Sequence, residues 1–186
     1  MGNKTSGARI LGVRTFGDEV LAALAPLGLA AAAGTALVVD LDPDGLAYPG
    51  QRSLAEAVAE GPRRTELRPE REGVAYLRNG GADVDAAVEM ITVLGENWPA
   101  IVLRLAATEV PFPVVPVRPL WPGFLAPQGG RPAVWQAVPG GGSPPGPGPV
   151  LPAPGRFTIA SLLGGRRPPR SRWIRAWIDV WGLPWR

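Results

Sequence analysis

The chain has 186 residues, of which 25 are Gly and 23 are Pro, although 46% of all residues are hydrophobic. It contains no Cys and no His, which excludes disulfides, zinc–thiolate sites, cysteine nucleophiles and catalysis by imidazole. The net charge of +3 is unevenly spread, because residues 151–186 contain seven Arg and a single acid, Asp179. We therefore expect the C-terminal part to meet an anionic surface, such as a membrane, nucleic acid or an acidic protein.

The first predicted elements are a strand, a helix and a second strand. Residues 8–14 are apolar enough for a strand, and Asp18 is a suitable N-cap for the Ala- and Leu-rich helix that follows. Pro26 is expected to kink or end this helix. Residues 35–41 form a nearly continuous apolar run, which is typical of a strand buried on both faces of a parallel sheet.

The same alternation continues in the middle of the chain. Ser53 is expected to cap a short helix that runs to Glu60, and Glu56 completes a capping box. Three further strands are predicted at residues 73–77, 100–105 and 114–117, with a helix at 83–95 between the first two. The Pro residues around 114–117 favour an edge strand or an extended polyproline-like segment there.

This order predicts four regions. Residues 8–118 should form an α/β domain, with a small three-layer, mostly parallel sheet of the Rossmann-like or P-loop-like kind. Residues 1–7 should be a flexible N-terminus. Residues 119–165 should be an extended, semi-rigid linker, since 13 of the 17 residues at 139–155 are Pro or Gly. Residues 166–186 form a basic, Trp-rich tail.

The tail predicts a short amphipathic helix. Its Trp residues recur every four positions, with two Ile residues on the same side and Arg opposite. The candidate membrane- or partner-binding residues are Trp173, Ile174, Trp177, Ile178, Trp181, Trp185, Arg170, Arg172 and Arg175. Three interpretations stay open: an anchor at an anionic membrane surface, a helix in a partner's groove, or a helix that packs onto its own domain. Nucleic acid is disfavoured, because the basic residues are few.

A loop rich in carboxylates is the most specific motif of the chain. Asp40, Asp42 and Asp44 alternate at the end of the strand at 35–41, and open α/β sheets bind ligands at the carboxyl ends of their strands. These residues are the candidate nucleotide or metal contacts. The alternative is a solvated turn, since Asp-Pro-Asp-Gly is an ordinary turn sequence.

This stretch resembles the ParA/MinD family of deviant Walker ATPases, in which a strand ends in an Asp-x-Asp-Pro-type motif before a Ser-Leu helix, here Ser53-Leu54. The resemblance implies that Asp40 and Asp42 lie near magnesium and the attacking water. The family's Gly-rich phosphate loop is missing, because Arg14-Thr15-Phe16-Gly17-Asp18-Glu19 stands in its place. Arg104 stands near the position of a second magnesium-binding Asp.

These departures predict a degenerate domain with no catalytic residue, metal or cofactor. We expect a non-catalytic adaptor or regulatory protein that binds a protein partner or a membrane surface through residues 166–186. One alternative is a magnesium-dependent ATPase that binds ATP at Asp40 and Asp42, and another is a structural subunit of a larger bacterial assembly. The expected location is the cytoplasm, with peripheral binding at the inner face of the membrane as a variant, and homo-oligomerisation stays open.

Overall fold

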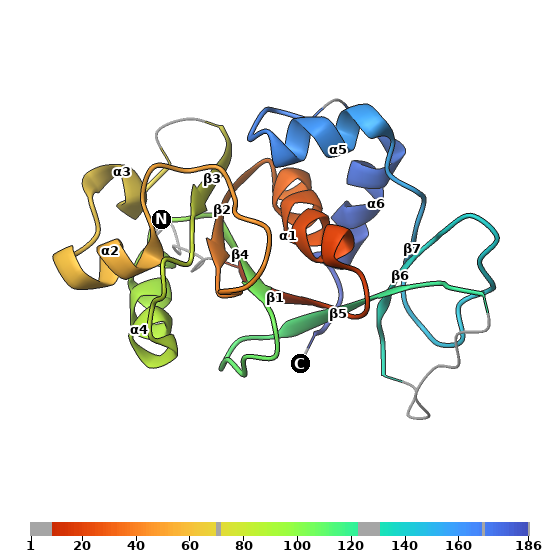
Figure 1. Ribbon diagram of the computed structural model, residues 1–186, viewed down its shortest axis with the longest axis horizontal. Helices are drawn as coiled ribbons and strands as arrows, with labels where there is room; N and C mark the ends of the chain where they lie inside the picture. Colours follow the sequence, from red (N-terminus) through yellow and green to blue (C-terminus); the bar gives the residue numbers. More distant parts are fainter. Residues whose placement is uncertain (1–8, 70–71, 123–130, 169, 186) are drawn as a thin grey trace, which may run out of the picture.

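A computed structural model describes residues 9–69, 72–122, 131–168 and 170–185, so the predicted flexible segment 1–7 lies outside the described residues. Over these ranges the chain forms one seven-stranded, all-parallel sheet in the order β3-β2-β4-β1-β5-β6-β7 (Figure 1). The strands are β1 (Arg9–Thr15), β2 (Thr35–Asp40), β3 (Gly73–Leu77), β4 (Ala100–Leu105), β5 (Val114–Pro119), β6 (Val134–Gln136) and β7 (Val150–Leu151). The helices are α1 (Glu19–Ala33), α2 (Leu54–Glu60), α3 (Arg64–Leu67), α4 (Val84–Leu94), α5 (Arg156–Leu163) and α6 (Arg172–Val180). The predicted α/β, Rossmann-like fold is confirmed.

The helices lie in two layers, because successive side chains of each strand point to opposite faces of the sheet. Val38 and Val102 pack with α1, α5 and α6, whereas Leu37 and Ile101 pack with α2 and α4. Figure 1 shows α2, α3 and α4 on one side of the strands and α1, α5 and α6 on the other. In the described part of the chain, no helix is long and apolar enough to cross a membrane.

Helix α1 has the predicted caps at both ends, Asp18 and Gly34, and it does not end at Pro26. The Asp18 side chain accepts a hydrogen bond from the Leu21 N–H, and Gly34 closes the helix with a φ of 82°. The helix runs through Pro26 to Ala33, so an end at Pro26 was wrong. Burial of most of its length, Pro26 included, compensates for the missing N–H.

The predicted linker at 119–165 is wrong, because this segment supplies two strands and a helix. Strands β6 and β7 extend the sheet, and Val134 and Leu151 are fully buried. Proline lacks an N–H but keeps its carbonyl group, so Pro147 and Pro149 accept hydrogen bonds from the N–H groups of Ala133 and Trp135. The α/β domain therefore extends well beyond residue 118.

Strand β5 is an interior strand between β1 and β6, which corrects the predicted edge position. Gly12 donates to the Pro113 carbonyl, so by alternation Val115 and Val117 turn their N–H groups toward β1. The nitrogen of Pro116 points the other way, just before pairing with β6 begins at Val117. Each Pro thus avoids a position where the ladder needs a donor.

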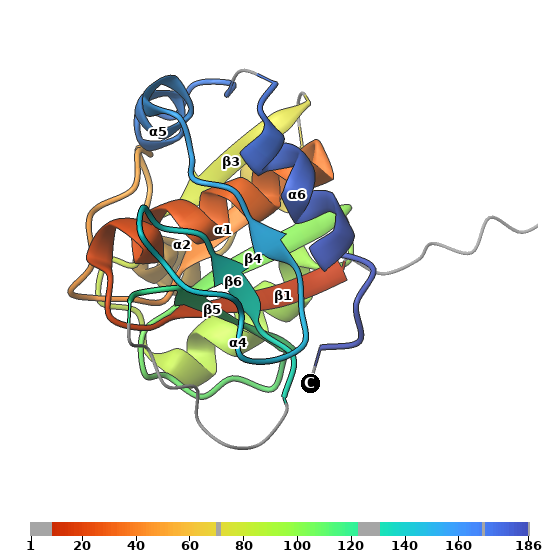
Figure 2. The same ribbon diagram turned by 90° about the vertical axis from the view of Figure 1, so that its right-hand side faces the viewer.

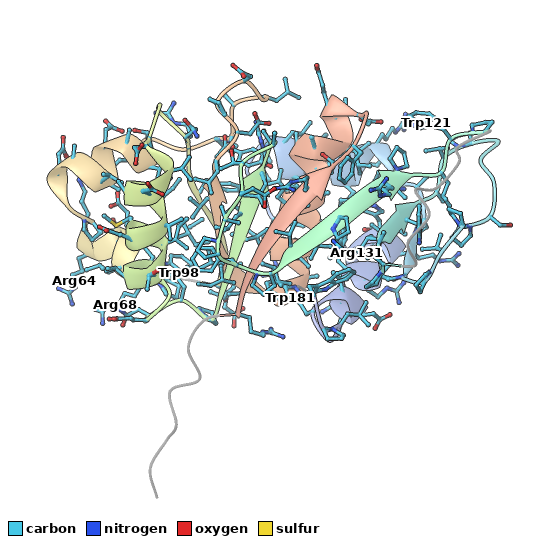
Figure 3. The ribbon with its side chains drawn as sticks, turned by 90° about the horizontal axis from the view of Figure 1, so that it is seen from below. Arg64, Arg68, Trp98, Trp121, Arg131 and Trp181 are labelled. Carbon is cyan, nitrogen blue, oxygen red and sulfur yellow. The ribbon has the colours of Figure 1, made fainter. Side chains whose placement is uncertain are left out.

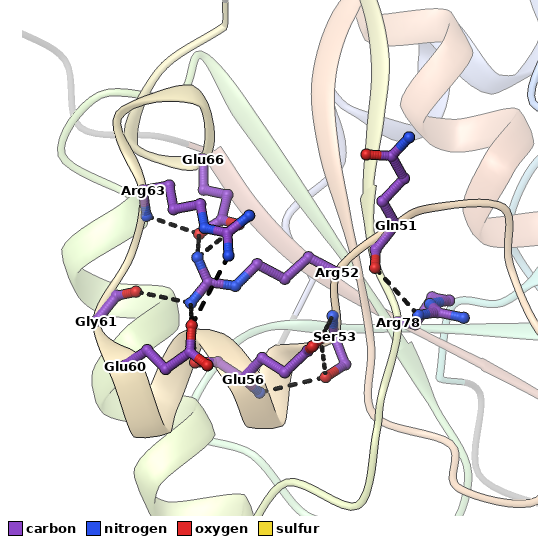
Figure 4. Close-up of polar contacts among 9 residues, drawn as sticks. All are labelled: Gln51, Arg52, Ser53, Glu56, Glu60, Gly61, Arg63, Glu66 and Arg78. Carbon is purple, nitrogen blue, oxygen red and sulfur yellow. Dashed lines mark hydrogen bonds and ion pairs between the residues drawn. The ribbon is translucent and has the colours of Figure 1, made fainter.

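The connection from β2 to α2 and α3 is held by a buried arginine. The predicted capping box at Ser53 and Glu56 is confirmed. Beside it, Arg52 forms ion pairs with Glu60 at 3.1 Å and Glu66 at 3.3 Å, and it donates to the Gly61 carbonyl (Figure 4). These contacts tie the end of α2 and helix α3 to the segment that precedes α2.

Candidate functional site

The two neighbouring strands β2 and β4 end in opposite charges. Asp40 and Arg104 are direct neighbours in the register of these strands, at the carboxyl edge of the sheet. Arg104 Nε lies 3.2 Å from Asp40 Oδ1, and Arg104 Nη2 lies 3.2 Å from Asp42 Oδ2. The Arg104 side chain is 2% exposed. Both carboxylates are therefore occupied by an internal cation.

The loop after β2 closes over this guanidinium. Arg104 Nη1 donates to the Leu46 carbonyl at 2.6 Å, and the guanidinium carbon lies 4.7 Å from the centre of the Tyr48 ring. The Tyr48 hydroxyl in turn donates to the Ala23 carbonyl of α1. A Cβ at Gly45 would overlap Arg104 Nη2, so only glycine lets the loop approach the charge this closely.

Burial dominates the electrostatics of the site. It raises the pKa of Asp40 from 3.8 to about 6, although Arg104 and the Asp42 N–H act in the opposite direction. Burial also raises the pKa of the Tyr48 hydroxyl strongly. The Nε of Arg104 forms an ion pair with Asp40 but no well-aligned hydrogen bond. Arg104 therefore lowers the pKa of Asp40 by less than burial raises it.

Of the three predicted carboxylates, the structure brings two together. Asp40 and Asp42 share Arg104, whereas Asp44 is exposed and follows the solvated-turn interpretation. The turn is built from local bonds: the Asp42 N–H donates to Asp40 Oδ1 at 3.0 Å, and the Asp44 N–H donates to Asp42 Oδ1 at 3.2 Å. Among the described residues there is no group of three or more carboxylates that could hold a metal ion.

The junction of β1 and α1 is equally unsuited to a phosphate. Asp18 Oδ1 accepts the Leu21 N–H at 2.8 Å, which uses one of the donors that a helix N-terminus offers to an anion. Glu19 adds a second negative charge in the first turn, and it would repel a bound anion.

Exposed apolar side chains follow three strands at the same edge, a feature that the sequence did not predict. Phe16 follows β1, Leu46 follows β2 and Trp121 follows β5, with exposed fractions of 39%, 51% and 44%. The Arg118 guanidinium lies 4.3 Å from the centre of the Phe16 ring. In Figure 3, Trp121 lies at the opposite end of the molecule from Arg64 and Arg68.

The tail packs onto its own domain, which is the third of the predicted interpretations. Trp173 and Trp177 are buried against α1 and meet edge to face, with ring centres 5.6 Å apart. A Cβ at Gly28 would lie 2.5 Å from both rings, so this glycine provides the contact surface. Helix α6 lies alongside α1 in Figures 1 and 2.

The assignment of Trp173, Trp177 and Trp185 to an outward-facing contact surface is corrected accordingly, since all three are core residues. Trp173 Nε1 donates to Gln136, and Trp185 Nε1 donates to the Val180 carbonyl, whereas Trp177 Nε1 is buried with no hydrogen-bond partner among the described residues. The predicted residues that keep exposed or partly exposed side chains are Arg170, Arg172, Ile174, Arg175, Ile178 and Trp181.

The sequence contained a partial signal for Arg104 and none for its partners. Arg104 ends its strand as Asp40 ends the strand at 35–41, and two parallel strands of one sheet place such ends side by side. Asp40 and Arg104 meet because β2 and β4 are neighbours in the sheet, and the sequence pattern does not predict this strand order. Tyr48 and Gly45 are ordinary loop residues in sequence.

Comparisons with protein-family models, with curated proteins and with solved structures find no match to this chain.

Proposed function

We propose that this chain is a non-catalytic adaptor or regulatory protein, built on a degenerate ParA/MinD-like domain, that binds a protein partner. The observation that carries the proposal is the position of Arg104. Its buried guanidinium lies between Asp40 and Asp42, the two carboxylates that the resemblance assigns to magnesium and water. A cation in this place removes the negative charge that would attract a metal–nucleotide complex.

The partner-binding part of the proposal draws on the carboxyl edge. Phe16, Leu46 and Trp121 expose apolar surface in the loops that follow three parallel strands. Exposed aromatic side chains are enriched at protein contact sites. The loops that hold a ligand in other α/β domains would thus present a contact surface here.

A thermal-shift experiment tests the non-catalytic part. The melting temperature is measured with and without ATP and Mg²⁺ for the native protein, for Asp40→Asn and for the surface control Asp179→Asn. We expect no saturable shift for any of them. A shift in the native protein and in Asp179→Asn that Asp40→Asn abolishes would instead support the ATPase alternative.

The outer side of the tail supports a second candidate function, peripheral binding to an anionic membrane. Arg170, Arg172 and Arg175 are exposed, and Ile178 on the same helix is 54% exposed. Arg near a surface attracts anionic headgroups. Co-sedimentation with anionic vesicles is expected to fall when Arg172 and Arg175 are both changed to Gln, and unchanged binding would exclude this surface.

A further inference from the structure

The outer edge of β3 is one of the two ends of the sheet, and among the described residues no strand pairs with it along Gly73–Leu77. β3 is the last strand of the sheet next to β2, at the end away from β6 and β7 (Figure 1). Just after the strand, the outer side of Arg78 pairs in parallel with the segment around Ser53. The Arg78 N–H donates to the Arg52 carbonyl at 3.4 Å, and the Arg78 carbonyl accepts the Leu54 N–H at 2.6 Å. This side is therefore able to pair with a parallel segment.

The alternation of a strand identifies the groups that remain. Backbone groups two residues apart point to the same side, so Val74 and Tyr76 face outward together with Arg78. Gly50 lies against the Tyr76 carbonyl, since a Cβ there would be 3.4 Å from it. Val74 thus presents an N–H and a carbonyl, and Tyr76 presents its N–H, with no strand paired to them among the described residues.

These groups lie in a groove of about 300 Å³. Its floor is the edge of β3 from Gly73 to Tyr76. The remaining lining comes from both helix layers and from the loop after β2: Pro49, Gly50, Thr65, Pro69, Glu72, Trp98, Gly164 and Gly165. A Cβ at Gly165 would lie 2.9 Å from Pro49, so the glycine that stands two residues after the end of α5 lets the chain come close to the loop after β2.

The borders of the groove are positively charged. Arg64 and Arg68 flank the lining residues Thr65 and Pro69, and Arg166 and Arg167 follow Gly165. All four are exposed, and none has an ion-pair partner among the described residues. Figure 3 shows Arg64 and Arg68 together at the α3 end of the molecule. Glu72 is the one acid in the described lining.

We propose that this groove binds an extended acidic segment of a partner protein, which adds to the sheet as a strand beside β3. The segment's backbone would pair with Val74 and Tyr76, and its carboxylates would meet the four Arg residues. The inference rests on the proposed binding function and adds to it a site and a partner class. A second copy of the chain fits less well, because edge-to-edge pairing in either direction brings Arg-bearing borders together.

The probe is a fluorescein-labelled peptide of alternating Thr and Glu, about eight residues long to match the length of a strand. Anisotropy is expected to show saturable binding that weakens with salt, whereas a peptide of alternating Thr and Lys should not bind. Val74→Pro removes the outward N–H and leaves the ladder to β2 intact, so it should weaken binding about tenfold. Equal binding by the Lys peptide or by Val74→Pro would overturn the proposal.

Two further arms keep the test decisive if Val74→Pro does not fold. Two peptides are compared, one N-methylated at its odd-numbered residues and the other at its even-numbered residues. One of them should lose binding and the other should keep it, because alternate N–H groups of an added strand point toward β3. Arg64→Gln with Arg166→Gln should weaken binding, whereas the control pair Arg131→Gln with Arg156→Gln should not, since both residues are exposed and neither borders the groove lining. Indifference to both changes would refute strand addition to an acidic peptide, as would a dimer in solution that Val74→Pro dissociates.

The same samples are assayed with ATP and Mg²⁺, so the two proposals fail separately. A nucleotide-dependent shift contradicts the non-catalytic function without touching the groove. Loss of peptide specificity contradicts the groove without restoring an ATPase.

Discussion

The carboxyl edge at Arg104 and the outer edge of β3 are both polar ends of one sheet, and they are built in opposite ways. At the carboxyl edge, a guanidinium that is 2% exposed is surrounded by two carboxylates, a carbonyl and an aromatic ring. At β3, backbone groups face a groove, and the Arg residues beside the groove lining, Arg64, Arg68, Arg166 and Arg167, are exposed and form no ion pair among the described residues.

This difference separates stability from binding. A buried charge that loses its partner costs several kcal/mol, whereas an exposed charge costs little when it is removed. Substitutions at the carboxyl edge should therefore change the free energy of unfolding, and substitutions at β3 should change binding alone. Four experiments can break or sharpen that contrast.

Arg104→Ala should have the largest effect, a loss of about 3–5 kcal/mol in the free energy of unfolding, because it leaves Asp40 and Asp42 without their cation. Urea unfolding at neutral pH measures it. Arg118→Ala is the matched control, since it removes a partly exposed cation and its contact with the Phe16 ring, worth about 0.5–1 kcal/mol. Equal losses in both variants would mean that the Arg104 cluster is not a structural centre.

The pH dependence of stability should follow Asp40. Its pKa of about 6 in the folded protein lies above the ordinary value of 3.8, so the folded state binds this proton more tightly than the unfolded chain. The contribution is complete below about pH 4 and is lost as the pH rises through 6, up to about 3 kcal/mol.

The measurement is the stability of the native protein minus that of Asp40→Asn, determined at pH 4 and at pH 7.5. This difference should be larger at pH 4, and the other carboxylates cancel in it. Asp44→Asn controls for the loss of a carboxylate from the same turn. A difference that grows toward pH 7.5 would show that Arg104 outweighs burial.

Gly45→Ala should destabilise the fold by about 1–3 kcal/mol, because the new methyl group displaces the Arg104 guanidinium. Gly142→Ala is the control, since a Cβ there meets nothing within 4 Å. Thermal unfolding of the two variants gives the comparison. If both melt like the native protein, the loop after β2 is not closed tightly over the charge.

Glu72→Gln should have the smallest effect on folding, within about 0.5 kcal/mol, because this groove residue is exposed. The acidic peptide should nevertheless bind more tightly to it, since the variant removes the one described acid from the groove lining. A clear loss of stability would mean that the β3 edge is structurally as closed as the carboxyl edge.

Local chemistry explains what could be predicted. The caps at Asp18, Ser53 and Gly34 depend on residues within one turn of the helix end, and the structure has all three. The strand at 35–41 was visible because its apolar run is continuous, and its end placed Asp40 at the carboxyl edge. The groove at β3 could not be predicted, since its lining comes from segments far apart in sequence.

The sequence by itself determined the alternation of strands and helices through residue 105 and the chemistry that the missing Cys and His exclude. Only the tertiary structure decided the fate of the Pro- and Gly-rich segment, because a strand needs a neighbour with which to pair. It also decided that Trp173 and Trp177 are core residues, since Gly28 creates the surface that receives them. Likewise, Asp40 and Asp42 changed from candidate metal contacts to the counter-ions of Arg104 through a strand order that sequence patterns do not encode.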